Sequence, residues 1–231
     1  MTPVLLAVTG GSGSGKTTVA HALAAALPAG AAVVLAEDRY YRDIGRQPGF
    51  DPAAFDFDRA EARDHALLME QLDALKAGRA VRAPRYCFRN HWRLRGADLI
   101  RPAPLIVLEG IHLLATPELA ARFDLTVYVD TPDDIRLIRR LLRDTGPRSA
   151  GGRGRRWRQV LEQYLGTVRP GHLAHTAPCA ARADLVIADH STRMDGADPL
   201  QTEALIAPIL QHPTLAAVRG AAPVGALTGS P

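Results

Sequence analysis

The chain has 231 residues, which is enough for one domain with a sizeable hydrophobic core. Hydrophobic residues make up 47% and charged residues 23%, a balance that excludes a disordered or fibrous protein. The formal net charge of +4 is modest, but nine arginines lie between Arg136 and Arg158, and this cluster indicates an anionic ligand.

Three further features narrow the class of protein. The arginines are not interleaved with aromatic residues, so we expect no nucleic-acid partner. The sequence has no run of the ~20 apolar residues that span a membrane and no signal-peptide pattern, so we expect no membrane partner. Cys87 and Cys179 lack metal-ligand spacing and favour a reducing compartment, so we expect a cytoplasmic protein.

The predicted elements alternate between strands and helices along most of the chain. Short apolar runs predict buried parallel strands at 3–9, 32–36, 105–108, 125–129 and 185–187. Helical periodicity predicts helices at 16–27, 58–77, 132–144, 157–168 and 200–211. This alternation favours an α/β fold with a doubly wound parallel sheet.

The remaining segments complete the predicted domain plan. Residues 81–101 mix arginines and aromatic residues with no clean period, which predicts a small inserted lid or hairpin. We expect one domain over 1–219 and a flexible tail over 220–231, where glycine, alanine and proline dominate.

A glycine-rich segment, GGSGSGKTT, lies between the first predicted strand and the first predicted helix. It fits the pattern G-x-x-x-x-G-K-[ST], in which backbone N–H groups and a helix N-terminus bind phosphate oxygens. The lysine reaches the β- and γ-phosphates, and the following hydroxyl binds Mg²⁺. The predicted nucleotide-binding residues are Gly10, Gly11, Ser12, Gly13, Ser14, Gly15, Lys16, Thr17 and Thr18.

A P-loop by itself predicts a nucleoside triphosphate but no particular reaction. The chain has 26 arginines and only two lysines, Lys16 and Lys76, and it contains no Asn-Lys-x-Asp motif for guanine. A GTPase is therefore not favoured, although GTP stays an alternative phosphoryl donor to ATP.

A kinase also needs carboxylates near the γ-phosphate, to receive a proton and to hold the metal. Asp38 follows the second predicted strand, and Glu109 ends the third. Parallel sheets bind ligands at the carboxyl ends of their strands, so both acids are expected at the site. We predict Asp38 as the catalytic carboxylate, and Thr17, Glu109 and Asp38 as the magnesium ligands.

Several segments, in order, make the chain resemble the uridine kinase (uridine–cytidine kinase) family within the P-loop phosphoribulokinase/uridine kinase group. EDRYYRD resembles the family's D-S-F-Y-R, and GFDPAAFDFD resembles N-F-D-H-P-x-A-F-D. YCFRNHWR resembles Y-D-F-x-x-H-x-R, and VLEGI resembles a strand that ends in E-G-I. VDTPDDIRLIRRLLRD, VLEQY and ADLVIADHS follow in family order.

The resemblance implies a role for each matching residue. Asp38 matches the catalytic aspartate at the 5′-hydroxyl, and Asp51 matches the aspartate that binds the ribose 2′- and 3′-hydroxyls. Tyr86 and His91 match residues at the pyrimidine base, with Tyr41 and Phe88 beside them. The arginines that match those around the phosphates and the nucleoside are Arg140, Arg143, Arg153 and Arg155. Gln163 matches a nucleoside-contacting glutamine, whereas Arg136, Arg156 and Arg158 are expected to be solvated.

The sequence departs from the family pattern in three places. Arg39 replaces a small serine, which is expected to add a cation near the acceptor, and Cys87 replaces an acid. The connection TGPRSAGGRGRR is several residues longer than usual, and GFDPAAFD is one residue shorter than its counterpart.

The resemblance implies an ATP- and Mg²⁺-dependent kinase that phosphorylates uridine or cytidine at the 5′-hydroxyl. A small nucleoside and further copies of the chain, in a homo-oligomer, are the expected partners. Two alternatives stay open. One is a kinase of the same fold for nicotinamide riboside, pantothenate, ribulose phosphate or an unusual nucleoside. The other is a catalytically idle, ATP-gated binding protein.

Overall fold

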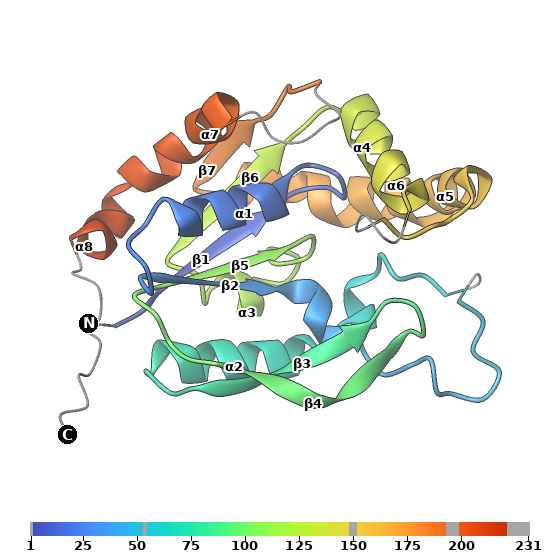
Figure 1. The fold of residues 1–231 in the computed structure, drawn as a ribbon, viewed down its shortest axis with the longest axis horizontal. Coiled ribbons are helices and arrows are strands. Elements are labelled where there is room, and N and C mark those ends of the chain that lie inside the picture. The colour runs from blue at the N-terminus through green and yellow to red at the C-terminus, as the bar shows by residue number, and fades with distance from the viewer. Residues whose placement is uncertain (1, 53–54, 148–151, 193–198, 221–231) are drawn as a thin grey trace.

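The centre of the molecule is a sheet of parallel strands (Figure 1). The computed structural model describes residues 2–52, 55–147, 152–192 and 199–220. Within them the sheet has the order β2-β5-β1-β6-β7. The strands are β1 (Val4–Thr9), β2 (Ala32–Ala36), β5 (Leu105–Gly110), β6 (Leu125–Asp130) and β7 (Leu185–Ala188). The five predicted strands are thus all present, and the loop after β1 leaves the middle of the sheet.

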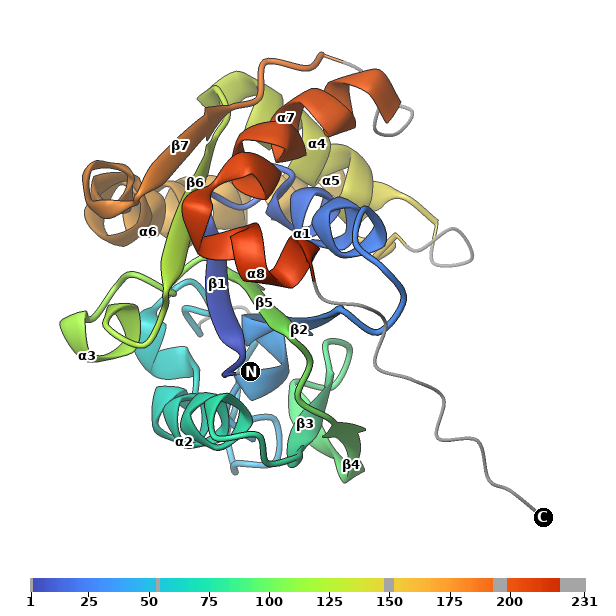
Figure 2. The ribbon, with the colours of Figure 1, turned by 90° about the vertical axis from the view of Figure 1, so that its left-hand side faces the viewer.

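Helices cover both faces of this sheet (Figures 1 and 2). Leu6 and Val8 of β1 pack toward α1 (Lys16–Ala25), α7 (Pro199–Gln211) and α8 (Ala216–Arg219). Leu5 and Ala7 pack on the other side, toward α2 (His65–Lys76) and α3 (Pro117–Ala120). Successive side chains of a strand point to opposite faces, so a run that is apolar throughout needs cover on both. The predicted doubly wound α/β fold is confirmed.

A hairpin separate from the main sheet occupies the segment predicted as a lid or hairpin. Strands β3 (Val81–Cys87) and β4 (Trp92–Ile100) pair antiparallel, with an irregularity between Pro84 and Tyr86. Val81 and Ala83 are buried in the same core as α2. The base of the hairpin is therefore fixed to the domain, and its turn extends toward the carboxyl edge of the sheet.

Two more helical segments carry the arginine-rich part of the sequence. Helix α4 (Asp133–Thr145) follows β6, and α5 (Trp157–Gln163) continues into a π-helical segment over Tyr164–Val168. The chain then passes through α6 (Arg169–Gly171), a second π-helical segment (His172–Thr176) and a 3₁₀-helix (Ala177–Arg182) before β7. The segment over 157–168 is therefore helical throughout, as predicted, and its second part is π-helical.

One helix starts later than its sequence pattern predicts. The helix expected over 58–77 begins at His65, because Asp64 caps it and accepts a hydrogen bond from the Leu67 N–H at 3.2 Å. The preceding residues form a loop with one 3₁₀ turn, Ala60–Ala62. The expected tail lies outside the described residues from 221 onward.

Candidate active site

The P-loop connects β1 to α1, and its glycines allow neighbouring groups to approach closely. Gly10, Gly13 and Gly15 have φ values of 148°, 84° and 87°, a backbone conformation that other residues rarely adopt. A Cβ on Gly13 would clash with the backbone oxygen of Arg136 in α4. The loop can therefore pack against α4 only because glycine occupies this position.

A cavity of about 530 Å³ opens beside the P-loop, a size that suits a small ligand. The predicted residues that line it are Ser12, Lys16, Thr17, Asp38, Tyr41, Tyr86, Phe88, His91, Glu109, Arg140, Arg143, Arg153, Arg155 and Gln163. The lining also includes residues that the sequence did not single out, namely Phe57, Asp58, Arg63, Arg89, Gly110, Ile111 and Gly152. The P-loop, the hairpin and the arginine-rich helices thus contribute to one site.

Lys16, Thr17 and Glu109 form the phosphate end of this cavity. The Thr17 hydroxyl donates a hydrogen bond to Glu109 Oε2 at 3.0 Å. Burial raises the pKa of Glu109 despite the nearby Lys16 ammonium, and burial lowers the pKa of Lys16 despite Glu109 and Asp38. A divalent cation beside Thr17 and Glu109 would offset the cost of burying the carboxylate, and oxygen ligands suit Mg²⁺. These residues therefore fit a magnesium ion, and Asp38 lines the same cavity.

The aromatic end of the cavity lies under the hairpin turn. Tyr41 packs against Tyr86 with ring centroids 5.1 Å apart, and Tyr86 packs edge-on against Phe88 at 5.3 Å. His91 adopts φ 57° in the turn and stacks on Phe57 at 4.5 Å. Burial and the cations Arg155 and Arg153 lower the pKa of His91, so its ring is neutral at physiological pH. A flat ring can be held here between apolar faces.

The arginines of α4 and the following loop surround a single buried carboxylate. Asp144 is fully buried and forms ion pairs with Arg143 at 2.8 Å, Arg153 at 3.5 Å, Arg140 at 3.7 Å and Arg155 at 4.0 Å. Burial raises the pKa of Asp144, but the arginines outweigh this and hold it below its usual value. Asp144 therefore keeps four guanidinium groups together although they repel one another.

Two hydrogen-bonding groups connect these arginines to the rest of the site. Arg140 donates to the Ser12 hydroxyl at 2.8 Å, which ties α4 to the P-loop. Arg140 and Arg155 also donate to the amide oxygen of Gln163, at 3.0 and 2.7 Å. Gln163 thus orients two arginines in this structure.

The expected ribose-binding aspartate, Asp51, is exposed and lies outside the cavity lining. Asp58 lines the cavity instead, because Phe57 packs between Tyr41 and His91 and presents the next residue to the cavity. Thr167 donates to the Asp58 carboxylate at 3.2 Å. The Phe-Asp pair occurs three times in this segment, at 50–51, 55–56 and 57–58, so the pair alone does not distinguish Asp58 from Asp51.

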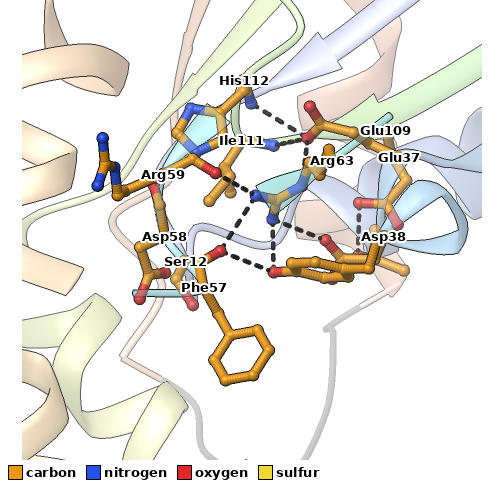
Figure 3. A network of polar contacts seen from close by, with 12 residues as sticks. Ser12, Glu37, Asp38, Phe57, Asp58, Arg59, Arg63, Glu109, Ile111 and His112 are labelled. Carbon is orange, nitrogen blue, oxygen red and sulfur yellow. Dashed lines mark hydrogen bonds and ion pairs between the residues drawn. The ribbon is translucent and has the colours of Figure 1, made fainter. Parts of the chain in front are cut away.

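One signal for Asp58 was nevertheless present. FDRAEARD, residues 57–64, fits F-D-H-P-x-A-F-D without the missing residue that the alignment on Asp51 requires. In this register Arg63 stands where the motif has its second phenylalanine. Arg63 is buried and contacts Asp38, as Figure 3 shows.

Two arginines differ from their sequence-based interpretation. Arg136, expected to be solvated, is buried and donates to the Thr131 backbone oxygen at 3.1 Å and to Asp133. It packs under the P-loop, where the absence of side chains on Gly11 and Gly13 makes room for it. Arg39, expected near the acceptor, forms an ion pair with Asp98 on the hairpin at 2.6 Å instead. Arg156 and Arg158 are exposed, as predicted.

Comparison with known protein families identifies the group to which this site belongs. The family described as "Phosphoribulokinase / Uridine kinase family" matches residues 5–194. The chain belongs to this family.

Among the curated members of the family, uridine kinases are similar over most of the chain. Uridine kinase of Chloroflexus aggregans is 39% identical over 207 residues, which cover 90% of this chain and 94% of the relative. Uridine-cytidine kinase A of Dictyostelium discoideum is 37% identical over 185 residues, 80% of this chain and 36% of the relative.

Solved structures of low sequence identity share the fold of the family. A putative fructose transport system kinase from Silicibacter sp. TM1040 has a TM-score of 0.60 at 23% identity and covers 80% of this chain and 89% of its own. Phosphoribulokinase from Rhodobacter spheroides has a TM-score of 0.58 at 16% identity, over 86% of this chain and 74% of its own. The predicted family and fold are thus confirmed.

Proposed function

We propose that the protein transfers the γ-phosphoryl group of ATP to the 5′-hydroxyl of uridine or cytidine, which gives the nucleoside monophosphate and ADP. One observation carries this proposal: Lys16 and Thr17 of the P-loop share a single cavity with Asp38 and an aromatic recess. The similarity to curated uridine kinases supports the same acceptor.

Each end of the cavity has a role in this reaction. Thr17, Glu109 and Asp38 would hold Mg²⁺, which would supply positive charge to the phosphate oxygens. Lys16 and the arginines around Asp144 offset the charge that develops on the transferred group. Asp38 orients the 5′-hydroxyl and accepts its proton. Catalysis is then mostly a matter of positioning and charge compensation.

The nucleoside occupies the other end. The Asp58 carboxylate accepts hydrogen bonds from the vicinal ribose hydroxyls, a role for which an ionised carboxylate is well suited. The base lies between Tyr86, Phe88 and His91. A neutral imidazole donates at one nitrogen and accepts at the other, so His91 serves both uracil and cytosine edges.

A substrate screen tests the proposal directly. ADP formation is measured with ATP and Mg²⁺ and with uridine, cytidine, adenosine and guanosine, and then with nicotinamide riboside, pantothenate and ribulose 5-phosphate. We expect turnover with both pyrimidine ribonucleosides and poor turnover with the other acceptors. Faster turnover with another acceptor would reject the assignment. ADP release that no acceptor stimulates would indicate an ATP-gated binding protein.

Three further properties belong to this proposal. ATP is the donor, and replacing it with GTP in the same assay tests the choice. Cys87 and Cys179 are free thiols, which favours a cytoplasmic enzyme.

We also propose a homo-oligomer, and light scattering at assay concentration measures its mass. None of the helices formed by the described residues is long and apolar enough to cross a membrane.

A further inference from the structure

Arg63 is an arginine with almost no exposure at the wall of the cavity. Only 1% of its side chain is exposed, yet Arg63 is among the residues that line the cavity. It lies just before α2, in the loop that carries Phe57 and Asp58. A buried charge requires compensating partners, and Arg63 has them on several sides (Figure 3).

The first partner is Asp38. Arg63 Nη2 donates to Asp38 Oδ1 at 3.0 Å, and 41% of the Asp38 side chain is still exposed toward solvent. This bond restrains rotation of the carboxylate by engaging one of its oxygens. In the proposed reaction the acceptor hydroxyl would then meet the other oxygen, Oδ2.

The second partner is Glu37, which balances the charge and anchors the guanidinium. Glu37 is fully buried, and its Oε2 lies 3.6 Å from Arg63 Nε. The Glu37 carboxylate also accepts bonds from the Ile111 and His112 backbone N–H groups, at 2.8 and 3.1 Å, and contacts His65. Burial raises the pKa of Glu37, but Arg63 and His65 hold it well below its usual value. Glu37 is therefore a fixed anion.

The third contact reaches the aromatic recess. Arg63 Nη2 donates to the Tyr41 hydroxyl at 2.7 Å, and the guanidinium carbon lies 4.3 Å from the centre of the Tyr41 ring. Arg63 Nη1 donates to the Phe57 backbone oxygen at 3.2 Å. One rigid group thus contacts the acceptor carboxylate, the wall of the base recess and the residue before Asp58.

We propose that Arg63 is a positioning residue, which holds the Asp38 carboxylate in its reactive orientation and at a fixed distance from the nucleoside-binding recess. This inference rests on the proposed function, because it requires Asp38 to act on the acceptor hydroxyl. Arg63 itself does not exchange a proton in the reaction. A guanidinium suits this role, because its fork of donors bonds several acceptors at once without losing its charge.

The test is a double-mutant cycle with Arg63→Met and Asp38→Asn. Methionine keeps an unbranched apolar stem but removes every donor. We expect Arg63→Met to lower kcat by about ten- to a hundredfold, as expected for lost hydrogen bonds to charged groups, and to leave the KM for ATP unchanged. In the Asp38→Asn background the same change should cost less than about threefold, because residues that act through one another are not additive.

The matched control is Arg93→Met. Arg93 donates to the backbone oxygens of Tyr40 and Tyr41 and pairs with Asp64, so it braces the same segment without contacting Asp38. We expect this variant to lose thermal stability but to keep kcat within about threefold of wild type. An equal loss of kcat in both variants would overturn the inference, since general loosening would then suffice.

The remaining outcomes are equally decisive. If Arg63→Met costs the same factor with and without the Asp38 carboxylate, Arg63 does not act through Asp38. If Asp38→Asn alone keeps wild-type turnover, the proposed function of Asp38 fails instead. If Arg63→Met does not fold, Arg63→Lys replaces it. Lysine keeps the charge near Glu37 but lacks the forked donors, so a native melting temperature with reduced kcat supports the inference, and wild-type kcat rejects it.

Discussion

At the scale of single residues, the position of the Lys16 side chain follows from its place at the start of α1. Lys16 begins α1 directly after a glycine in the left-handed conformation, and it lies in the cavity beside Glu109 and Asp38. It is partly buried among the charged groups of the cavity and not among the apolar side chains of the two main core clusters, so it contributes little to the hydrophobic core. We therefore expect the lysine to be important for binding phosphate and not for folding.

The substitution Lys16→Ala tests this distinction. We expect no measurable phosphoryl transfer and a melting temperature within a few degrees of wild type, because no large apolar contact is lost. Thermal denaturation and ADP formation are measured on the same preparation. Turnover near that of the wild-type enzyme would reject the assignment of the P-loop lysine.

Asp58 and Asp51 provide a matched pair of variants that tests the proposed sugar site. Asp58 lines the cavity and Asp51 is exposed outside it. We expect Asp58→Asn to lower kcat/KM for uridine by roughly ten- to a hundredfold, the usual loss for a hydrogen bond to a charged group. Asp51→Asn should change it little. Wild-type enzyme should also use 2′-deoxyuridine poorly. A larger loss of kcat/KM in Asp51→Asn than in Asp58→Asn would assign ribose binding to Asp51 instead.

At the scale of elements, α4 and the loop after it depend on Asp144. The carboxylate is fully buried among Arg140, Arg143, Arg153 and Arg155, so it compensates charges that come from a helix and from a loop. Removing its charge leaves the arginines to repel one another in a poorly solvated place.

We therefore expect Asp144→Asn to raise the KM for ATP and lower kcat together, with a fall in melting temperature. Sulfate should restore part of the lost stability, because a bound anion replaces the missing negative charge. The control is Arg158→Gln, a change at an exposed arginine nearby. It should alter neither the kinetic constants nor the melting temperature. Unchanged kinetics in Asp144→Asn would show that the arginines hold their positions unaided.

The hairpin turn offers a second test at this scale. His91 has φ 57°, which asparagine tolerates better than most residues, so His91→Asn removes the imidazole without straining the backbone. We expect kcat/KM to fall about tenfold for both uridine and cytidine, with the KM for ATP unchanged. A fall in kcat/KM for only one of the two pyrimidines would show that His91 recognises the edge of that base alone.

At the scale of the whole molecule, buried histidines make stability depend on pH. Burial lowers the pKa of His112 to about 4, and its Nε2 lies 2.7 Å from the Asp58 backbone oxygen. The unfolded imidazole titrates near its ordinary value of about 6.5. Between these two values the unfolded state binds more protons than the native state, so the free energy of unfolding decreases as pH falls from 6.5 toward 4.

The variant His112→Gln should weaken this dependence. Glutamine keeps an N–H donor for the Asp58 oxygen but does not titrate. We expect the stability lost by the wild type between pH 6.5 and 4 to exceed that of the variant by up to about 3 kcal/mol. Urea denaturation across that range measures the difference. Parallel pH curves would mean that His112 does not couple to unfolding.

The sequence determined the elements and the chemistry at the carboxyl edge of the sheet. Short apolar runs predicted the five strands, because a parallel strand covered by helices on both faces consists mostly of apolar residues. The P-loop was equally readable, since its backbone conformation requires glycine at Gly13 and Gly15. In a parallel sheet, Asp38 and Glu109 then necessarily lie near that loop.

Tertiary structure alone decided which of several similar residues enter the cavity. Asp58 and not Asp51 lies there because Phe57 packs on His91, a contact between segments that are distant in sequence. Arg136 is buried and Arg158 exposed for the same kind of reason, although both belong to one arginine-rich stretch. Local sequence fixes the backbone of an element, whereas the burial of a charge depends on partners that only the folded chain supplies. The contact between Arg63 and Asp38 is such a case, because it forms only when the loop before α2 folds against the end of β2.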